Sequence, residues 1–146
     1  MGASQATYDD VNLILRLFEL RREEKIRQAR DWFIKSFKAR NAEEFMALCP
    51  PGSETNAYYR MVVTYWDMAA SFVTSGVLNQ ELFFQSGGEL LFVWERMRDV
   101  VPYFRETYKN PGIGKNLETV ANAFIEWMNN RSRDTYPAFS AMVRGA

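Results

Sequence analysis

The residues best suited to chemistry in this 146-residue sequence are charged side chains set into an apolar segment. Arg60 and Asp67 lie seven residues apart, so on a helix they share one face, with Thr64 between them. Because the positions around them are mostly apolar, we expect this face to pack inside the fold. Buried charges need partners, since an unpaired one is strongly destabilising. Arg22 and Glu89 are charged residues elsewhere in the chain that could supply them.

Two interpretations of these four residues are open. In the first, a buried ion-pair network fixes how the helices pack. In the second, the same residues line a small polar pocket between helices, which binds a ligand or supports a reaction. The first interpretation predicts that removing Asp67 lowers stability, and the second predicts that binding is lost while stability is kept. The residues concerned are Arg60, Asp67, Glu89 and Arg22.

The residues that are missing narrow the possible chemistry. The chain has no histidine and one cysteine, which excludes Ser-His-Asp and Cys-His catalysis, His-based zinc and di-iron sites, and an intrachain disulfide. Cys49 precedes Pro50 at the end of a predicted helix, where the helix dipole does not activate a thiol, so we expect a buried, inert side chain. We expect no catalytic residue, no metal and no cofactor, and the sequence favours a non-enzymatic role.

Two glycine-containing segments invite comparison with phosphate-binding loops. In Ser86-Gly87-Gly88-Glu89, serine and glutamate occupy the positions of a helix capping box, and a glutamate in the first turn repels an anion. Gly112-Ile113-Gly114-Lys115 lacks the glycine spacing and the serine or threonine of a phosphate loop. We therefore interpret the first segment as a capping box and the second as a plain loop.

Charge is balanced over the whole chain but not along it. Lys and Arg number 18 and Asp and Glu number 18, unlike the basic composition of a dedicated nucleic-acid-binding protein. Residues 16–40 carry a net charge of +5, but acidic residues interrupt this stretch between residues 19 and 31, so we expect no nucleic-acid partner. The sequence has no apolar run long enough to span a membrane and no signal peptide at its start, so we expect a cytoplasmic location.

Helical periodicity runs through nearly the whole sequence and indicates an all-α fold, an irregular bundle in a single domain over residues 1–146. Capping residues, glycines and prolines divide it into segments. We expect residues 1–8 to form a flexible N-terminus. The predicted main helices span about 9–38, 54–75, 87–108 (kinked at Pro102) and 116–131, with short helices near 42–48, 80–85 and 137–143.

Apolar residues exceed what a single core requires. Aromatic residues make up 15% of the chain, and several predicted helices carry large rings on two faces. Surplus apolar surface indicates a partner or a second copy. We therefore expect a helical interaction or scaffold module that contacts a protein partner or forms a homo-oligomer. The surplus positions are Leu13, Leu17, Phe83, Phe84 and Phe92.

Four stretches of the sequence stand out, namely LRREEKIRQAR at 20–30, YWDMAA at 65–70, GVL at 76–78 and GGELL at 87–91. These stretches are similar to those of a group of short bacterial proteins of uncharacterised function. The resemblance covers about residues 10–130 and consists of packing and capping residues. It implies an all-helical fold and a bacterial source, and it assigns no active-site residue. Some members of the group carry a membrane helix before the first long helix, which we do not expect here.

Overall fold

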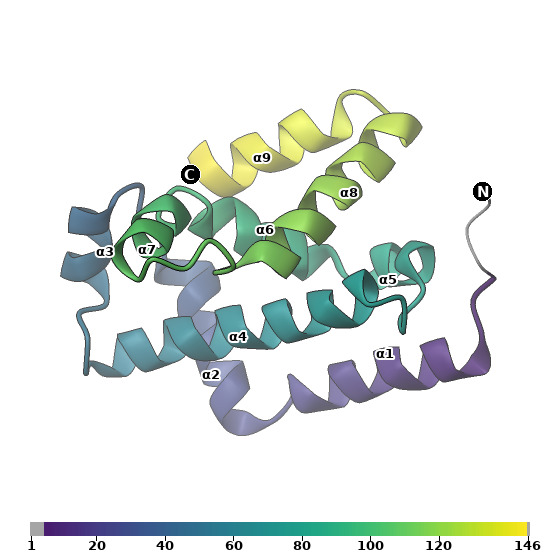
Figure 1. Cartoon of the computed structure of the whole chain (residues 1–146), viewed down its shortest axis with the longest axis horizontal. Coiled ribbons are helices and arrows are strands. Elements are labelled where there is room, and N and C mark those ends of the chain that lie inside the picture. Colours follow the sequence, from purple (N-terminus) through teal and green to yellow (C-terminus); the bar gives the residue numbers. More distant parts are fainter. Residues whose placement is uncertain (1–4, 146) are drawn as a thin grey trace.

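The structure is a computed structural model that describes residues 5–145, and within that range every regular element is a helix (Figure 1). The all-α fold expected from the sequence is therefore confirmed. The helices are α1 (Tyr8–Leu20), α2 (Glu24–Ser36), α3 (Ala42–Leu48), α4 (Glu54–Thr74), α5 (Gln80–Ser86), α6 (Gly88–Met97), α7 (Val101–Thr107), α8 (Lys115–Arg131) and α9 (Thr135–Gly145).

The longest of these helices, α4, lies in the middle of the bundle (Figure 1). α2 and α8 pack directly against it, and α6 contacts both α4 and α8. Apolar residues wrap most of its circumference, so it is buried from several sides. Trp66, near its midpoint, has 1% of its surface exposed. Polar groups on this helix are thus the ones that the fold brings closest to the core.

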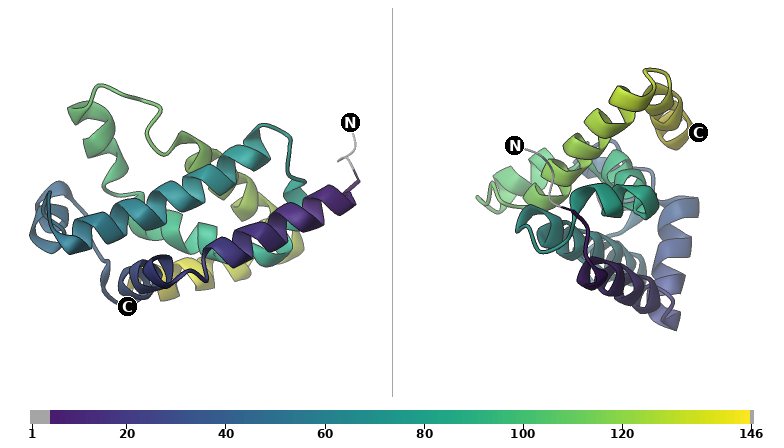
Figure 2. Two further views of the ribbon diagram at one scale, coloured as in Figure 1. Left: turned by 90° about the horizontal axis from the view of Figure 1, so that it is seen from below. Right: turned by 90° about the vertical axis from the view of Figure 1, so that its right-hand side faces the viewer.

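The helix predicted over 9–38 is in fact two helices. They separate at Glu23, whose carboxylate accepts hydrogen bonds from the backbone N–H groups of Lys25 and Ile26, at 3.1 and 3.2 Å, and so starts a new helix. The break turns α2 across α4, while α1 runs along the edge of the bundle (Figure 1 and Figure 2). Both helices can then turn an apolar face toward the same core.

The helix predicted over 87–108 is also divided, close to the proline that predicted a kink. α6 ends at Met97 and α7 begins at Val101, so Pro102 stands in the first turn of α7. A proline costs little there, because the N–H groups of the first turn have no partner within the helix. The remaining predicted helices agree with the structure within two residues at each end.

The first helix begins earlier than predicted, at a capping box. The Thr7 hydroxyl accepts a hydrogen bond from the backbone N–H of Asp10 at 3.3 Å, and the Asp10 carboxylate accepts one from the backbone N–H of Thr7 at 2.7 Å. Of the residues 1–8 expected to be flexible, 1–4 lie outside the described part of the chain, whereas Thr7 and Tyr8 are the cap and first residue of α1.

Candidate functional site

Glu89 is the predicted site residue that lies in a partly buried ion pair. Its carboxylate accepts two hydrogen bonds from Arg30, with Nε–Oε2 2.8 Å and Nη2–Oε1 2.7 Å, in the bidentate geometry that a planar guanidinium favours. The indole N–H of Trp66 donates a further hydrogen bond to Oε2 at 3.1 Å. Helices α2, α4 and α6 therefore meet at one carboxylate. These three residues are named the central cluster below.

The central cluster also holds the C-terminal end of α1. The Nη1 atom of Arg30 donates to the carbonyl of Arg21 at 3.1 Å, and the hydroxyl of Tyr65 donates to the carbonyl of Leu17. The Arg21 guanidinium lies 5.1 Å from the centre of the Trp66 ring. Arg30 thus satisfies the carbonyl of Arg21, the C-cap of α1, and Tyr65 adds a second donor to the Leu17 carbonyl, which also accepts from the backbone N–H of Arg21 at 3.3 Å.

Electrostatics keep these side chains in the protonation states that the contacts need. The hydrogen bond with the Glu89 carboxylate raises the pKa of Arg30, which therefore stays a cation. Burial raises the pKa of Tyr65, so its phenol stays protonated and can donate. Burial lowers the pKa of Arg21, but an arginine starts so high that it remains charged at neutral pH. Both Glu89 oxygens accept hydrogen bonds, so this arrangement joins helices.

The capping box predicted for Ser86-Gly87-Gly88-Glu89 is wrong. α6 begins after Gly87 without a side-chain cap, because the Glu89 carboxylate turns to Arg30 instead. Gly87 is needed for a different reason, the close packing of α5 on α6. A Cβ atom at Gly87 would lie 2.8 Å from both the ring and the carbonyl oxygen of Phe83. The close contact between α5 and α6 thus requires a residue without a side chain at this position.

The other predicted site residues lie apart from the central cluster. Asp67 accepts a hydrogen bond from the backbone N–H of Leu117 at 3.1 Å, so it caps α8, whose own N-cap is a glycine. Arg60 is exposed, and its Nε atom donates to Asn56 at 3.0 Å. Arg22 is exposed in the turn between α1 and α2. The structure does not bring the four predicted residues together.

Arg30 is the functional partner that sequence reasoning missed. It lies in a strongly charged stretch, where an arginine is normally solvated. The helical spacing could nevertheless have indicated it, because Arg30 is four residues after Ile26 and three before the buried Phe33. That spacing places a charge on the apolar face of α2, where it must find a partner.

The residues predicted to form a surplus apolar surface pack inside the chain. Leu17, Phe83 and Phe84 are at most 4% exposed, and Leu13 and Phe92 are partly buried against the same core. The Phe84 ring lies 4.5 Å from an aromatic ring of α8. Leu17, Phe83 and Phe84 are therefore not free to contact a partner, because neighbouring helices cover them.

Exposed apolar side chains lie instead on the outer face of α1. Tyr8, Val11, Leu15 and Phe18 are 78%, 41%, 54% and 39% exposed. Their spacing of three, four and three residues places them along one side of the helix. α1 forms the lower edge of the molecule in Figure 1. These four residues are named the α1 stripe.

A second carboxylate of α6, Glu95, holds the C-terminal helix. Its side chain is fully buried and accepts hydrogen bonds from the hydroxyls of Ser140 at 2.6 Å and Tyr136 at 3.0 Å, both on α9. The adjacent Arg96 donates from Nε to the carbonyl of Val143 at 2.7 Å. α9 is therefore attached to α6 by polar contacts inside the protein. Glu95, Tyr136 and Ser140 are named the C-terminal cluster.

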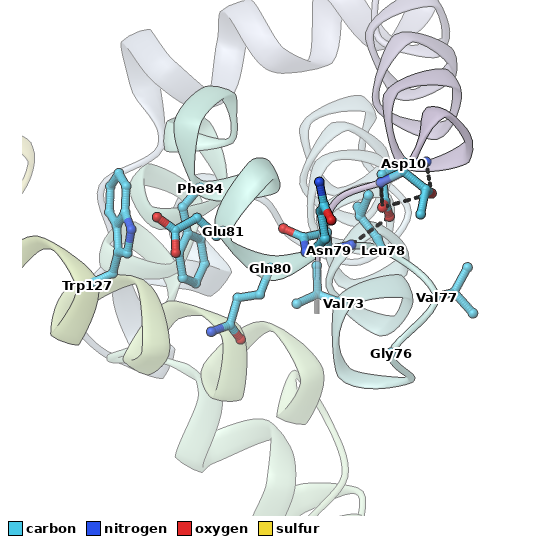
Figure 3. Close-up of a pocket in the computed structure, with 12 residues that line it drawn as sticks. Asp10, Val73, Gly76, Val77, Leu78, Asn79, Gln80, Glu81, Phe84 and Trp127 are labelled. Atoms are coloured by element: carbon cyan, nitrogen blue, oxygen red, sulfur yellow. Dashed lines mark hydrogen bonds between the residues drawn. The ribbon is translucent and has the colours of Figure 1, made fainter. Parts of the chain in front are cut away.

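Figure 3 shows a pocket of about 480 Å³ between the start of α1, the turn before α5, and Trp127 of α8. At one end of it, the Asp10 carboxylate accepts hydrogen bonds from the backbone N–H groups of Thr7 at 2.7 Å and Asn79 at 2.8 Å. These hydrogen bonds lower the pKa of Asp10, which is ionised at neutral pH. The carboxylate thus joins α1 to the turn after α4. Its hydrogen bonds to backbone N–H groups replace the water that burial removes.

The remaining reactive group, the Cys49 thiol, is buried as expected. Burial raises its pKa to about 11, so at neutral pH it is a protonated thiol and a poor nucleophile. Among residues 5–145, no group of three or more Cys, Asp or Glu side chains is placed to hold a metal ion.

The fold and its contacts define a class of protein, an all-helical bundle whose partly buried charges tie helices together. Within that class, the chain belongs to a family described as a domain of unknown function (DUF4760), whose model matches residues 6–127, from α1 through most of α8. No curated protein and no solved structure matches the chain. In the part of the chain that the structure describes, no helix is long and apolar enough to cross a membrane.

Proposed function

We propose that this domain is a non-enzymatic interaction module that pairs with a second copy of itself through the α1 stripe. The exposure of the stripe is the observation that carries the proposal. Four large apolar side chains lie on the outer face of a peripheral helix, whereas Phe83 and Phe84 of α5 are buried in the core. A contiguous apolar stripe on an exposed helix is typical of a protein–protein contact.

The order of residues along the stripe suits a two-fold axis. The three-four-three spacing reads the same in both directions, so it is unchanged when a second α1 packs antiparallel to the first. In that pair Tyr8 meets the Phe18 of the second copy, and Val11 meets its Leu15. Aromatic rings then pack at both ends and aliphatic side chains at the middle. A two-fold interface needs such self-complementarity, because one patch must fit itself.

Charge does not oppose this pairing. The formal net charge of the chain is zero, so two copies approach without overall repulsion. The stripe itself contains no charged side chain. The nearby Arg16 and Glu19 lie 3.8 Å apart on the same helix, so each is already beside an opposite charge.

Sedimentation velocity of the wild type and of Leu15→Glu tests the proposal. We expect the wild-type chain to form a dimer with a dissociation constant in the micromolar range, as is usual for a small contact. Leu15→Glu should be monomeric at the same concentrations, because it places a carboxylate at the middle of the stripe. Since Leu15 is 54% exposed, the variant should keep its melting temperature.

Met142→Glu is the matched control. Met142 is 64% exposed on α9, and α9 lies on the opposite side of the bundle from α1 in Figure 1, so this variant should dimerise like the wild type. A wild-type chain that stays monomeric at high micromolar concentration contradicts the proposal. A dimer that persists in Leu15→Glu contradicts it as well.

A further inference from the structure

A second cavity lies beside the N-terminal half of α4. In Figure 1 this end of α4 is the one remote from α1. Its volume is about 260 Å³, and α3, α4, α6 and α7 surround it. Most of its lining is apolar. It is named the α7 pocket, and the lining residues used below are Phe45, Met46, Tyr59, Arg60, Met97 and Phe104.

Aromatic rings form one wall of the α7 pocket. The centre of the Phe45 ring lies 4.8 Å from that of Tyr59 and 4.9 Å from that of Phe104, and both contacts are edge-to-face. Met46 and Met97 contribute flexible side chains that adapt to the shape of an apolar group. The volume lies just below the range of about 300–1,000 Å³ that is usual for ligand pockets, so it suits a small apolar molecule.

Arg60 supplies a positive charge to this pocket. Its Nε atom donates to the Asn56 side chain at 3.0 Å, and Asn56 donates in turn to the carbonyl of Cys49 at 3.0 Å, which orients the guanidinium. Within residues 5–145, the Nη1 and Nη2 atoms of Arg60 have no hydrogen-bond acceptor and no carboxylate partner. Five other arginines of the described residues do have a carboxylate partner, namely Arg16, Arg30, Arg98, Arg105 and Arg144.

Tyr59 adds a hydrogen-bond donor to the lining of the pocket. It is 7% exposed, and among the described residues its hydroxyl has no hydrogen-bond partner. Burial raises the pKa of this phenol, so it stays protonated at neutral pH. Solvent reaches this hydroxyl, so it is available to donate a hydrogen bond to an oxygen of a ligand.

We infer that the α7 pocket binds a small apolar carboxylate, such as a medium-chain fatty acid or an arylalkanoate. The apolar chain lies among the aromatic rings and methionines, and the carboxylate accepts hydrogen bonds from Nη1 and Nη2 of Arg60. Arg60 is the one cation among the pocket-lining residues, which matches the single charge of a carboxylate better than that of a phosphate dianion. This inference is independent of the pairing through the α1 stripe.

Calorimetric titration with octanoate and with 1-octanol tests the role of Arg60. Losing a hydrogen bond to a charged group costs about 1.5–3 kcal/mol, so Arg60→Gln should weaken octanoate binding about tenfold to a hundredfold. Binding of the uncharged 1-octanol should not change. Arg60 is exposed, so the variant should fold. Arg133→Gln, which removes another exposed arginine, is the control and should bind both compounds like the wild type.

Nuclear magnetic resonance of methionine methyl groups tests the location. Octanoate should shift the Met46 and Met97 signals, which come from the pocket. Met68 and Met142 are 37% and 64% exposed outside it, so their signals should stay in place.

The inference is overturned if octanoate does not bind, or if it binds Arg60→Gln and the wild type equally. It is also overturned if octanoate shifts Met68 or Met142 in place of the pocket signals. Titration of Leu15→Glu separates the two proposals, because that variant should lose pairing and keep octanoate binding.

Discussion

Two glutamates on α6, six residues apart, are buried in different ways. Glu89 faces a guanidinium that matches it with two hydrogen bonds, and 19% of its side chain is still exposed. Glu95 is fully buried, but its hydrogen bonds come from two neutral hydroxyls, and its nearest guanidinium nitrogen, on Arg98, is 3.9 Å away. The first carboxylate is thus charge-paired, and the second is mainly solvated by the protein.

The helices that each glutamate joins differ as well. The central cluster connects α2, α4 and α6 and holds the end of α1, all within the family-matched residues 6–127. The partners of Glu95 on α9 lie beyond that range. We therefore expect the central cluster to control global unfolding and the C-terminal cluster to control the attachment of one helix.

The largest effect is expected from breaking the Arg30–Glu89 pair. Arg30→Met should lower the free energy of unfolding by about 3 kcal/mol, because it leaves a largely buried carboxylate without its partner. Urea unfolding measures the change. Arg27→Met, at an exposed position one turn earlier, should stay within about 0.5 kcal/mol of the wild type. If Arg30→Met and Glu89→Gln prove additive in the double variant, the two side chains are not coupled.

A smaller and more local effect is expected from Glu95→Gln. A glutamine amide cannot accept both hydroxyl hydrogen bonds as the carboxylate does, so about 1–2 kcal/mol should be lost. Hydrogen exchange should quicken over residues 135–145, while α2 and α4 remain protected. Glu126→Gln, at an exposed position of α8, should change neither the free energy of unfolding nor the hydrogen exchange over residues 135–145. Equal loss of protection in α4 and α9 would show that the two clusters act as one unit.

The smallest effect concerns the far end of α1, and it depends on pH. Hydrogen bonds lower the pKa of Asp10 below its ordinary value of 3.8, so its ionised form stabilises the fold at neutral pH. This contribution is complete above pH 3.8 and is lost as the pH falls through the lowered pKa. The amide signal of Asn79 should therefore titrate with a midpoint below 3.8. Asp9→Asn should leave this titration in place, and Asp10→Asn should abolish it.

Short-range signals explain why the helices over 54–75 and 80–85 could be predicted from the sequence. Ser53 and Asn79 are helix caps that hydrogen-bond to a backbone N–H three residues later, at 3.1 and 2.9 Å, so a local pattern is enough to find them. The break at Glu23 was not predicted, because glutamate is not a preferred N-cap and the apolar period continues past it. Local patterns thus locate most helix ends but not this turn.

The contacts of the candidate site could be predicted only in part. The need for partners at Asp67 and Glu89 follows from charges placed among apolar residues. Their partners lie 50 and 59 residues away along the chain, and the partner of Asp67 is a backbone N–H, which no side-chain pattern marks. The exposure of Arg60 likewise depends on how α3 and α7 pack beside it.

The hydrogen bond from Trp66 to Glu89 makes the protein its own fluorescent probe. An indole that donates to a carboxylate and lies 5.1 Å from a guanidinium is an emitter whose spectrum responds when either charge moves. Trp127, with the Arg131 guanidinium 4.5 Å from its ring centre, is a second emitter on the helix that leads into α9. Two variants can each keep one tryptophan, Trp66 or Trp127, and carry phenylalanine in place of the others. The fluorescence of each variant then reports local unfolding around that tryptophan without an added label.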